Sequence, residues 1–151
     1  MEQRSIVILL AEDNPAHARL VERSLASNRV LNKLMHVSDG EEAVAYLRRE
    51  SPFTDPELSP RPDVVLLDLR LPKVDGLEVL RQIKTDPELM QLPVVVLSTS
   101  QSDIDVARAY QLHANSYVVK PLDFTALTQL IGDLGYYWLV WNRSPNRTLQ
   151  D

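Results

Sequence analysis

The sequence predicts an α/β protein built on a doubly wound parallel sheet, because strand-like and helix-like segments alternate along the chain five times. Three of the strand candidates are uninterrupted apolar runs, at residues 6–11, 64–67 and 93–97. Such runs favour strands that are buried on both faces. Acids, hydroxyl groups and a lysine follow where four of the strand candidates end. A parallel sheet would bring these polar groups together at one edge.

Length and composition describe one globular domain. The chain has 151 residues, of which 44% are hydrophobic and 25% charged, close to the average for folded domains. The formal net charge of −5, without any long basic run, argues against a nucleic-acid partner. There is no cysteine and no apolar stretch of membrane-spanning length, and we expect no signal peptide. We therefore expect a single cytoplasmic domain over residues 1–151, with its core at 5–135 and a C-terminal extension and tail at 136–151.

The first strand candidate leads into a capped helix. The run at 6–11 ends in Glu12 and Asp13, and Asn14 then stands where a helix cap is expected. Pro15 suits the first turn of a helix, which the apolar pattern extends to about residue 27.

The next segments are less regular. Residues 31–37 alternate enough to predict a strand nearer the edge of the sheet. Residues 38–41 offer a cap with acids in the first turn of a short second helix. Four prolines in residues 51–62 predict an ordered surface loop that leads into the core, not a linker between domains.

The central segment is residues 62–71. Its run at 64–67 predicts an inner parallel strand, and Asp68 follows directly at the C-terminal end of that strand. In open α/β sheets this edge is where ligands bind. Pro72 stops the strand, and residues 73–76 form a turn into the next helix.

The second half of the chain repeats the same alternation. The pattern predicts a helix from residue 77 to about residue 86, a buried strand at 93–97 and a helix at 103–112. A short strand at 116–119 then ends in Lys120. Ser98 and Thr99 follow the strand at 93–97, so their hydroxyls join the same edge as Asp68.

The strand ends together suggest a site for a phosphoryl group. Glu12, Asp13 and Asp68 would repel one another unless a cation relieves them. Mg²⁺ suits that role, because it binds few protein oxygens and keeps positions for water and phosphate. Lys120 would add a positive charge and Ser98 a hydroxyl donor.

These residues stand in an order that resembles the receiver domain of two-component response regulators. The matching motifs are Glu12-Asp13, the segment Leu-Leu-Asp-Leu-x-Leu-Pro-x-x-Asp-Gly around Asp68, the hydroxyl of Ser98, and the Tyr-Val-Val-Lys-Pro segment from Tyr117. The resemblance covers about residues 5–135 and implies a flavodoxin-like (βα)5 fold with strand order 2-1-3-4-5.

The resemblance also implies roles for individual residues. Asp68 would be the phosphoacceptor, with Ser98 and Lys120 contacting the phosphoryl oxygens and Tyr117 acting as the switch aromatic beside Ser98. Mg²⁺ would be bound by Asp13, Asp68 and the backbone carbonyl of Arg70, with Glu12 acting through water. The chain would then be a phosphoacceptor signalling protein and not an enzyme with a separate substrate.

Two positions depart from the common pattern of the family. Arg70 stands two residues after the acceptor, where many members have a smaller or neutral side chain, and Thr99 is bulkier than the usual residue next to the switch hydroxyl. Both flank the path of a hydrolytic water, so we expect them to modulate the phosphoryl lifetime. The proline-containing loop and the tryptophan-containing last helix further resemble single-domain regulators of cyanobacterial phytochromes, which implies a phytochrome-type histidine kinase as partner.

Two other functions remain as alternatives. A degenerate receiver could act as a phosphorylation-independent binding module, although Asp13, Asp68 and Lys120 are all present. An Asp-nucleophile phosphatase would need a second acid two residues after the nucleophile, and this chain has Arg70 there.

The last helix is expected to extend over residues 123–142, which is longer than one edge of the sheet requires. An apolar face at helical spacing contains Phe124, Leu127, Ile131, Leu134, Trp138 and Trp141. Its first four residues can pack on the sheet, and the two tryptophans continue the face past the expected end of the core. Tyr136, Tyr137, Leu139 and Val140 lie off that face. The surplus apolar surface predicts homodimerisation through an interface of Tyr136, Tyr137, Trp138, Val140 and Trp141.

Overall fold

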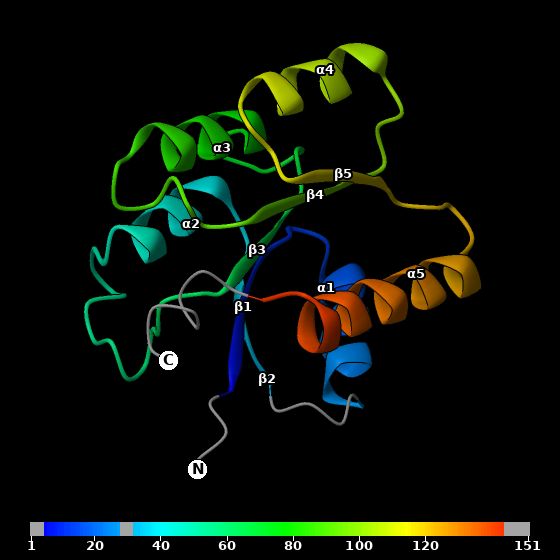
Figure 1. Ribbon diagram of the computed structural model, residues 1–151, viewed down its shortest axis with the longest axis horizontal. Coiled ribbons are helices and arrows are strands. Elements are labelled where there is room, and N and C mark those ends of the chain that lie inside the picture. Colours follow the sequence, from blue (N-terminus) through cyan, green and yellow to red (C-terminus); the bar gives the residue numbers. More distant parts are fainter. Residues whose placement is uncertain (1–4, 28–31, 144–151) are drawn as a thin grey trace.

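The computed structural model describes residues 5–27 and 32–143. Strands and helices alternate in this part of the chain in the predicted order (Figure 1). The elements are β1 (Ile6–Ala11), α1 (Pro15–Ala26), β2 (Asn32–Val37), α2 (Gly40–Leu47), β3 (Val64–Leu67), α3 (Gly76–Thr85), β4 (Val94–Ser98), α4 (Asp103–Gln111), β5 (Ser116–Val119), α5 (Phe124–Tyr136) and the π-helical turn η1 (Tyr137–Trp141).

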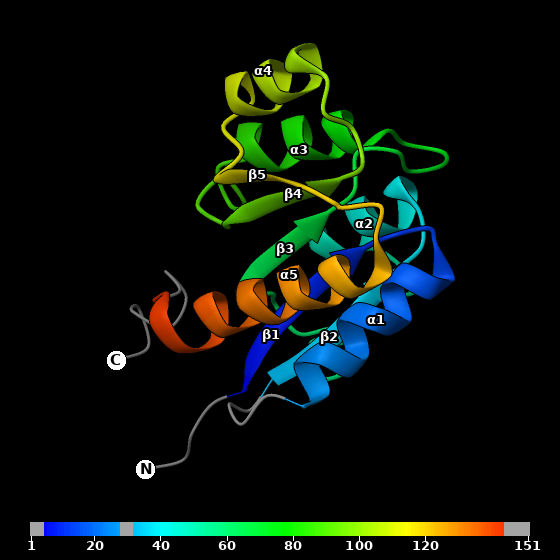
Figure 2. The same ribbon diagram turned by 90° about the vertical axis from the view of Figure 1, so that its right-hand side faces the viewer.

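The five strands form one parallel sheet in the order β2-β1-β3-β4-β5, which confirms the predicted fold class and strand order. Every residue of β1, β3 and β4 is buried, as continuous apolar runs require of inner strands. β2 is only partly buried and lies at an edge, as its weaker alternation predicts. The sheet twists between the two layers of helices (Figure 2).

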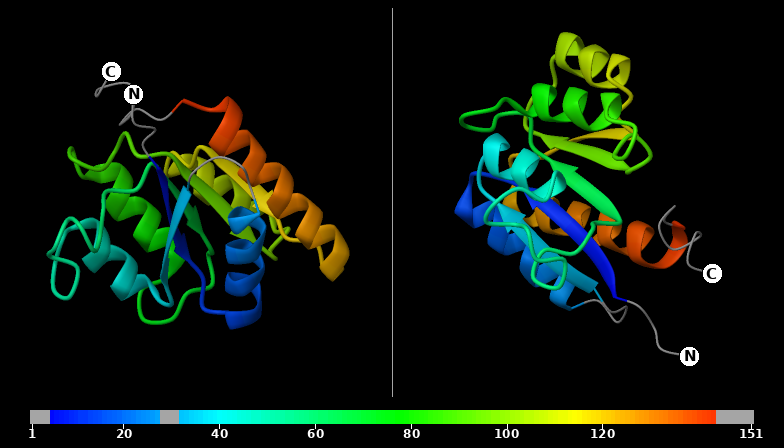
Figure 3. Two further views of the ribbon diagram at one scale, coloured as in Figure 1. Left: turned by 90° about the horizontal axis from the view of Figure 1, so that it is seen from below. Right: turned by 90° about the vertical axis from the view of Figure 1, so that its left-hand side faces the viewer.

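Helices cover both faces of the sheet (Figure 3). On one face, α1 and α5 pack against each other and bury the apolar cluster that includes Ile8, Val21 and Ile131. On the other face, α2, α3 and α4 cover the cluster that includes Leu9, Leu80 and Val96. Alternate residues of each inner strand enter these two clusters, which is the period-2 geometry of a strand. Among the described residues no helix is long and apolar enough to cross a membrane.

Two glycines allow the loop after β3 to close against its neighbours. A Cβ at Gly76 would stand 2.3 Å from the carbonyl oxygen of Asp68, and one at Gly40 would stand 1.8 Å from that of Val74. The N–H of Gly76 donates to the carbonyl of Leu69 at 3.0 Å. Only glycine fits such close approaches. These contacts fix the backbone on which Asp68 sits.

The proline-containing loop at 51–62 packs on α2. The rings of Tyr46 and Phe53 lie 5.2 Å apart between centroids, and the Tyr46 hydroxyl donates to the carbonyl of Pro60 at 2.7 Å. Ser59 is buried within the loop. The loop therefore packs on α2 as an ordered segment of the structure.

The last helix departs from the prediction in its final turns. α5 ends at Tyr136, and η1 continues with an N–H···O bond from Asn142 to Tyr137, five residues apart. This wider turn rotates the following side chains relative to an α-helix. Leu139, which was predicted to lie off the buried face, is buried at 4% exposure, so that placement is wrong. Trp141 is 70% exposed, in keeping with a position past the end of the core.

Phe124 was also placed on the buried face of the last helix, and this is wrong. It is the first residue of α5 and remains 61% exposed. Leu127 and Ile131, one and two turns later, do pack on the sheet as predicted. The spacing rule identifies a face of the helix, but it cannot show at which turn that face first meets the core.

Candidate functional site

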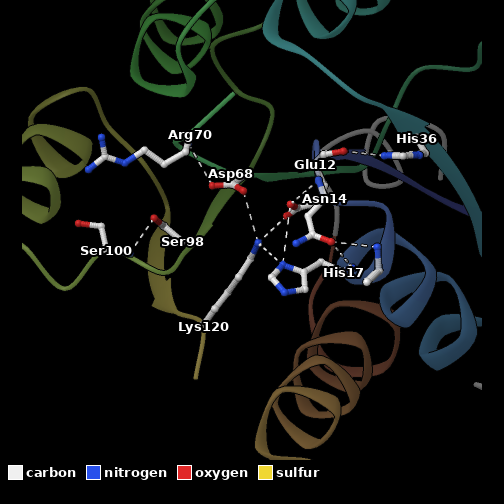
Figure 4. Close-up of polar contacts among 10 residues, drawn as sticks. Glu12, Asn14, His17, His36, Asp68, Arg70, Ser98, Ser100 and Lys120 are labelled. Atoms are coloured by element: carbon white, nitrogen blue, oxygen red, sulfur yellow. Dashed lines mark hydrogen bonds and ion pairs between the residues drawn. The ribbon is translucent and has the colours of Figure 1, made fainter. Parts of the chain in front are cut away.

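Four strand ends place the predicted residues in one buried cluster (Figure 4). Glu12 follows β1, Asp68 follows β3, Ser98 is the last residue of β4, and Lys120 follows β5. All four are buried, although each carries a polar or charged side chain. Buried charges are stable only when they are paired, so their partners determine what the site can do.

Lys120 is the centre of the cluster. Its Nζ lies 2.5 Å from Oε2 of Glu12, 3.4 Å from Oδ2 of Asp68 and 3.2 Å from Nδ1 of His17. Figure 4 shows the three partners converging on this nitrogen. The ammonium therefore lies beside the predicted phosphoacceptor, where it can neutralise negative charge that develops on Asp68.

Glu12 is the most strongly perturbed acid of the cluster. Burial raises its pKa to about 7, and the neighbouring charge of Asp68 acts in the same direction. The hydrogen bond and charge of Lys120 oppose this rise, as does the N–H of Asn14, which donates to Oε1 of Glu12 at 3.1 Å. Burial also lowers the pKa of His17, and the positive charge of Lys120 adds to that shift.

Three carboxylates of the site fit a hard divalent cation. Glu12, Asp13 and Asp68 each offer an oxygen, and these oxygens lie within 4.8 Å of one another. Glu12 and Asp68 are buried, whereas Asp13 is exposed at the mouth of the cluster. An all-oxygen set of this kind, open on one side, matches the preference of Mg²⁺ for a few carboxylates together with water and phosphate.

Ser98 and Tyr117 are joined through the loop that follows β4. The hydroxyl oxygen of Ser98 accepts the N–H of Ser100 at 3.1 Å, and the hydroxyl of Tyr117 donates to the carbonyl of Ser100 at 2.9 Å. The Tyr117 ring is already half-buried and packs against the core. The structure thus links the two predicted switch residues through one intermediate residue.

Arg70 points away from Asp68. Its backbone N–H donates to Oδ1 of Asp68 at 3.1 Å, but its guanidinium lies 3.3 Å from Oδ2 of Asp105 in the first turn of α4. The same oxygen of Asp105 accepts the hydroxyl of Ser100 at 2.6 Å. Thr99 is exposed beside these residues. Arg70 therefore pairs with an acid near the site in this structure.

Sequence reasoning missed three residues of this neighbourhood: His17, Ser100 and Asp105. The three histidines of the chain share no spacing typical of metal ligands, so the sequence alone assigns His17 no role. Its position just after Glu12 and Asp13, in the first turn of a helix that starts at the same sheet edge, was the available signal. Ser100 and Asp105 have an ordinary loop and helix-start context, and only the fold shows that Asp105 pairs with Arg70 and accepts the hydroxyl of Ser100.

The sequence is similar to those of known regulatory proteins. Residues 8–132 match the model of the response regulator receiver domain. The chain is 48% identical over 139 residues to the probable methanogenesis regulatory protein FilR2 of Methanothrix harundinacea (strain 6Ac), covering 92% of this chain and 87% of that protein. It is 42% identical over 133 residues to the response regulator Rcp1 of Synechocystis sp. (strain ATCC 27184 / PCC 6803 / Kazusa), covering 88% of each.

Solved structures extend the likeness to the fold. The phosphorylated cyanobacterial phytochrome response regulator RcpA superimposes with a TM-score of 0.89 at 43% identity, covering 94% of this chain and 99% of that chain. The Mn²⁺-bound form of Rcp1 superimposes with a TM-score of 0.88 at 41% identity, covering 93% and 99% respectively. The similarity therefore includes the whole sheet and its helices.

Proposed function

The chain belongs to the response regulator receiver domain family, and we propose that Asp68 is the residue on which it accepts a phosphoryl group from a histidine kinase. The observation that carries this proposal is the position of Asp68. It is a buried carboxylate at the end of the central strand, with the Lys120 ammonium 3.4 Å away and the Ser98 hydroxyl at the end of the neighbouring strand.

In the proposed transfer, a carboxylate oxygen of Asp68 bonds to phosphorus as the bond from phosphorus to the imidazole nitrogen of the donor breaks. The donor leaves as an imidazole, and the product is an acyl phosphate. Such transfers depend on positioning and charge neutralisation more than on covalent help from the protein. Lys120 lies where it would neutralise one phosphoryl oxygen, and Ser98 would donate its hydroxyl proton to another.

We propose Mg²⁺ as the cofactor of this reaction. Asp13, Asp68 and the backbone carbonyl of Arg70 would bind it directly, and Glu12 would hold one of its waters. When bound, Mg²⁺ would offset the negative charge of the phosphoryl oxygens and of the surrounding acids. The cluster of Glu12, Asp13 and Asp68 supports this assignment, as does the Mn²⁺-bound structure of a relative.

One of the most similar solved structures is that of the cyanobacterial phytochrome response regulator RcpA. On this basis we propose that the kinase partner is of the phytochrome type. The output would be a change in protein contacts, transmitted from Ser98 through Ser100 to Tyr117, in a chain that works as a single-domain cytoplasmic regulator. Self-association through the C-terminal helix is one such contact.

The test is labelling of the purified protein with a radiolabelled phosphodonor, either a phytochrome-type kinase with ATP or a small acyl phosphate. We expect Mg²⁺-dependent labelling of the wild type, no labelling of Asp68→Asn, and loss of labelling with EDTA. Asp133→Asn is a matched control, because Asp133 is an exposed acid on α5. Labelling that survives in Asp68→Asn would refute the assignment.

The same experiment separates the alternatives. A wild type that is never labelled but still binds a kinase or target would identify a phosphorylation-independent binding module. Steady release of phosphate from many equivalents of an ester would identify a phosphatase. Arg70 disfavours the phosphatase, because its side chain cannot act as the general acid that such enzymes place two residues after the nucleophile.

A further inference from the structure

The ammonium of Lys120 has one acceptor for each of its three protons. Two acceptors are carboxylates of the acid cluster, Glu12 at 2.5 Å and Asp68 at 3.4 Å. The third is Nδ1 of His17 at 3.2 Å, which comes from α1 and lies outside that cluster (Figure 4). Each partner stands on a different part of the sheet edge, so together they fix where the nitrogen lies.

His17 itself is held firmly. It stands in the first turn of α1, where its backbone N–H donates to the side-chain oxygen of the capping residue Asn14 at 3.2 Å. Pro15 fixes the backbone at the start of the same turn. The ring is only 26% exposed, and its Nδ1 also lies 3.9 Å from Oε1 of Glu12. The position of the imidazole is therefore set by the capped first turn of α1.

The direction of the hydrogen bond follows from the chemistry of the two groups. A lysine ammonium has donors and no acceptor, so Nδ1 of His17 must accept. The proton of the neutral ring is then on Nε2. His17 offers Lys120 a neutral acceptor, whereas the two carboxylates offer charged ones.

We propose that His17 is a positioning residue for phosphoryl transfer, acting through Lys120. In the proposed reaction, the carboxylate of Glu12 would also accept a hydrogen bond from a metal-bound water, and its hydrogen bond with Lys120 would weaken. During that change His17 would keep its hydrogen bond with the ammonium and so hold the ammonium beside Asp68, because His17 is not a metal ligand. This inference rests on the proposed function of Asp68.

The test compares two substitutions of His17 by their initial rate of labelling with a small acyl phosphate at fixed Mg²⁺. In His17→Asn the amide oxygen can occupy the place of Nδ1, while His17→Ala has no acceptor. We expect His17→Ala to be about threefold to tenfold slower, as suits the loss of one neutral hydrogen-bond acceptor from an ammonium that keeps its two carboxylate partners. His17→Asn should recover most of the rate. His113→Asn is the matched control, since His113 is exposed with a positive φ of 69° that asparagine accepts.

Two further measurements ask whether the effect passes through Lys120. In a double-mutant cycle, His17→Ala should cause no further loss in the Lys120→Ala background. Independently of activity, the ¹⁵N resonance of His17 Nδ1 in the full-length protein should shift when Lys120 is replaced by alanine.

Three results would each overturn the inference: equal labelling rates for His17→Ala and wild type, no recovery of the labelling rate in His17→Asn, or an Nδ1 resonance that is unchanged in Lys120→Ala. The same fold loss in both backgrounds of the cycle would also overturn it. Failure of the proposed function looks different, because the wild type would then be unlabelled or Asp68→Asn would be labelled normally, and the role of His17 would fall with it.

Discussion

Ser98 and Tyr117 both hydrogen-bond to the backbone of Ser100, the first through the N–H and the second through the carbonyl. Ser98 ends β4 beside Asp68, while Tyr117 lies on β5 and faces the core under α4. A phosphoryl group on Asp68 would attract the Ser98 hydroxyl as a donor. Turning the hydroxyl toward the phosphoryl group would move the oxygen that now accepts the N–H of Ser100, so the loop and Tyr117 would respond.

The first prediction follows from this link. Ser98→Ala should still be labelled on Asp68, because Lys120 and the acid cluster remain, but its labelling should change partner binding or self-association much less than in the wild type. Tyr117→Phe keeps the ring and loses only the hydroxyl bond to Ser100, so it should weaken coupling in the same direction. Both are measured as the shift in association constant on phosphorylation. Normal coupling in Ser98→Ala would contradict the switch.

The second prediction concerns how long the phosphoryl group lasts. Arg70 pairs with Asp105 in this structure, and a phosphoryl group on Asp68 would compete for its guanidinium. Together with Thr99 it would narrow the approach of water. Arg70→Ala and Thr99→Ala should therefore lose the phosphoryl group faster, by about twofold to tenfold, the range over which one charged contact commonly changes a rate. The measurement is the decay of labelled protein after removal of the donor.

Asp105→Asn serves as the converse variant. It weakens the resting pair with Arg70, whose side chain is already largely exposed, and leaves Arg70 free for the phosphoryl group. We expect its phosphoryl half-life to be at least that of the wild type. If Arg70→Ala and Asp105→Asn decay at the wild-type rate, neither residue governs access of water.

Much of this architecture could be predicted from the sequence because the inner strands are apolar on both faces. The runs that became β1, β3 and β4 fixed the fold class, and the polar residues at their ends located the site. Residues whose role depends on a neighbour far along the chain could not be found in this way. His17 meets Lys120 across 103 residues, and Arg70 meets Asp105 across 35.

The predicted burial pattern at the end of the last helix was wrong for a different reason. Helical spacing assumes 3.6 residues per turn, and η1 departs from that value within a single turn. Leu139 is buried there, although it lies off the apolar face that this spacing identifies.

The third prediction is a pH dependence of Mg²⁺ binding. Burial raises the pKa of Glu12 to about 7, well above its usual value of 4.5. Below that pH the carboxyl group is protonated and cannot help to hold a cation, so binding should release protons near neutrality. The affinity for Mg²⁺ should therefore rise with pH up to about 7 and then level off. Calorimetric titration of Mg²⁺ at several pH values measures this directly.

Glu12→Gln is the control for that titration. Its amide cannot ionise, so the rise in affinity near pH 7 should disappear while the overall affinity falls. The same shift predicts that Glu12 costs stability as pH rises from about 4.5 to about 7, because the folded protein binds the proton more tightly than the unfolded chain in that window. A Mg²⁺ affinity with the same pH profile in both proteins would show that another group titrates.

The last prediction is homodimerisation through the C-terminal helix. Tyr136, Tyr137, Val140 and Trp141 are exposed on α5 and η1, and the rings of Tyr136 and Trp141 lie 6.5 Å apart between centroids. Contiguous apolar surface of this kind commonly marks an interface, and each large side chain buried there would contribute roughly 1.5–3 kcal/mol. Trp138 is half-buried against the core, so it would add only its outer edge.

The burial of Leu139 determines how this prediction should be tested. Truncation after Gly135 would remove a core residue, and Trp138→Ala would open a gap beside the core, so both would confuse loss of stability with loss of contact. Trp141→Ala and Tyr137→Ala change only exposed side chains, and Leu122→Ala removes an exposed leucine from a different surface as the control. In sedimentation equilibrium with and without phosphodonor, we expect the wild type and Leu122→Ala to dimerise and the two aromatic variants to dissociate at about tenfold higher concentration, equal to about 1.4 kcal/mol. A wild type that stays monomeric at high micromolar concentration in both states would exclude the dimer and leave this surface to another partner.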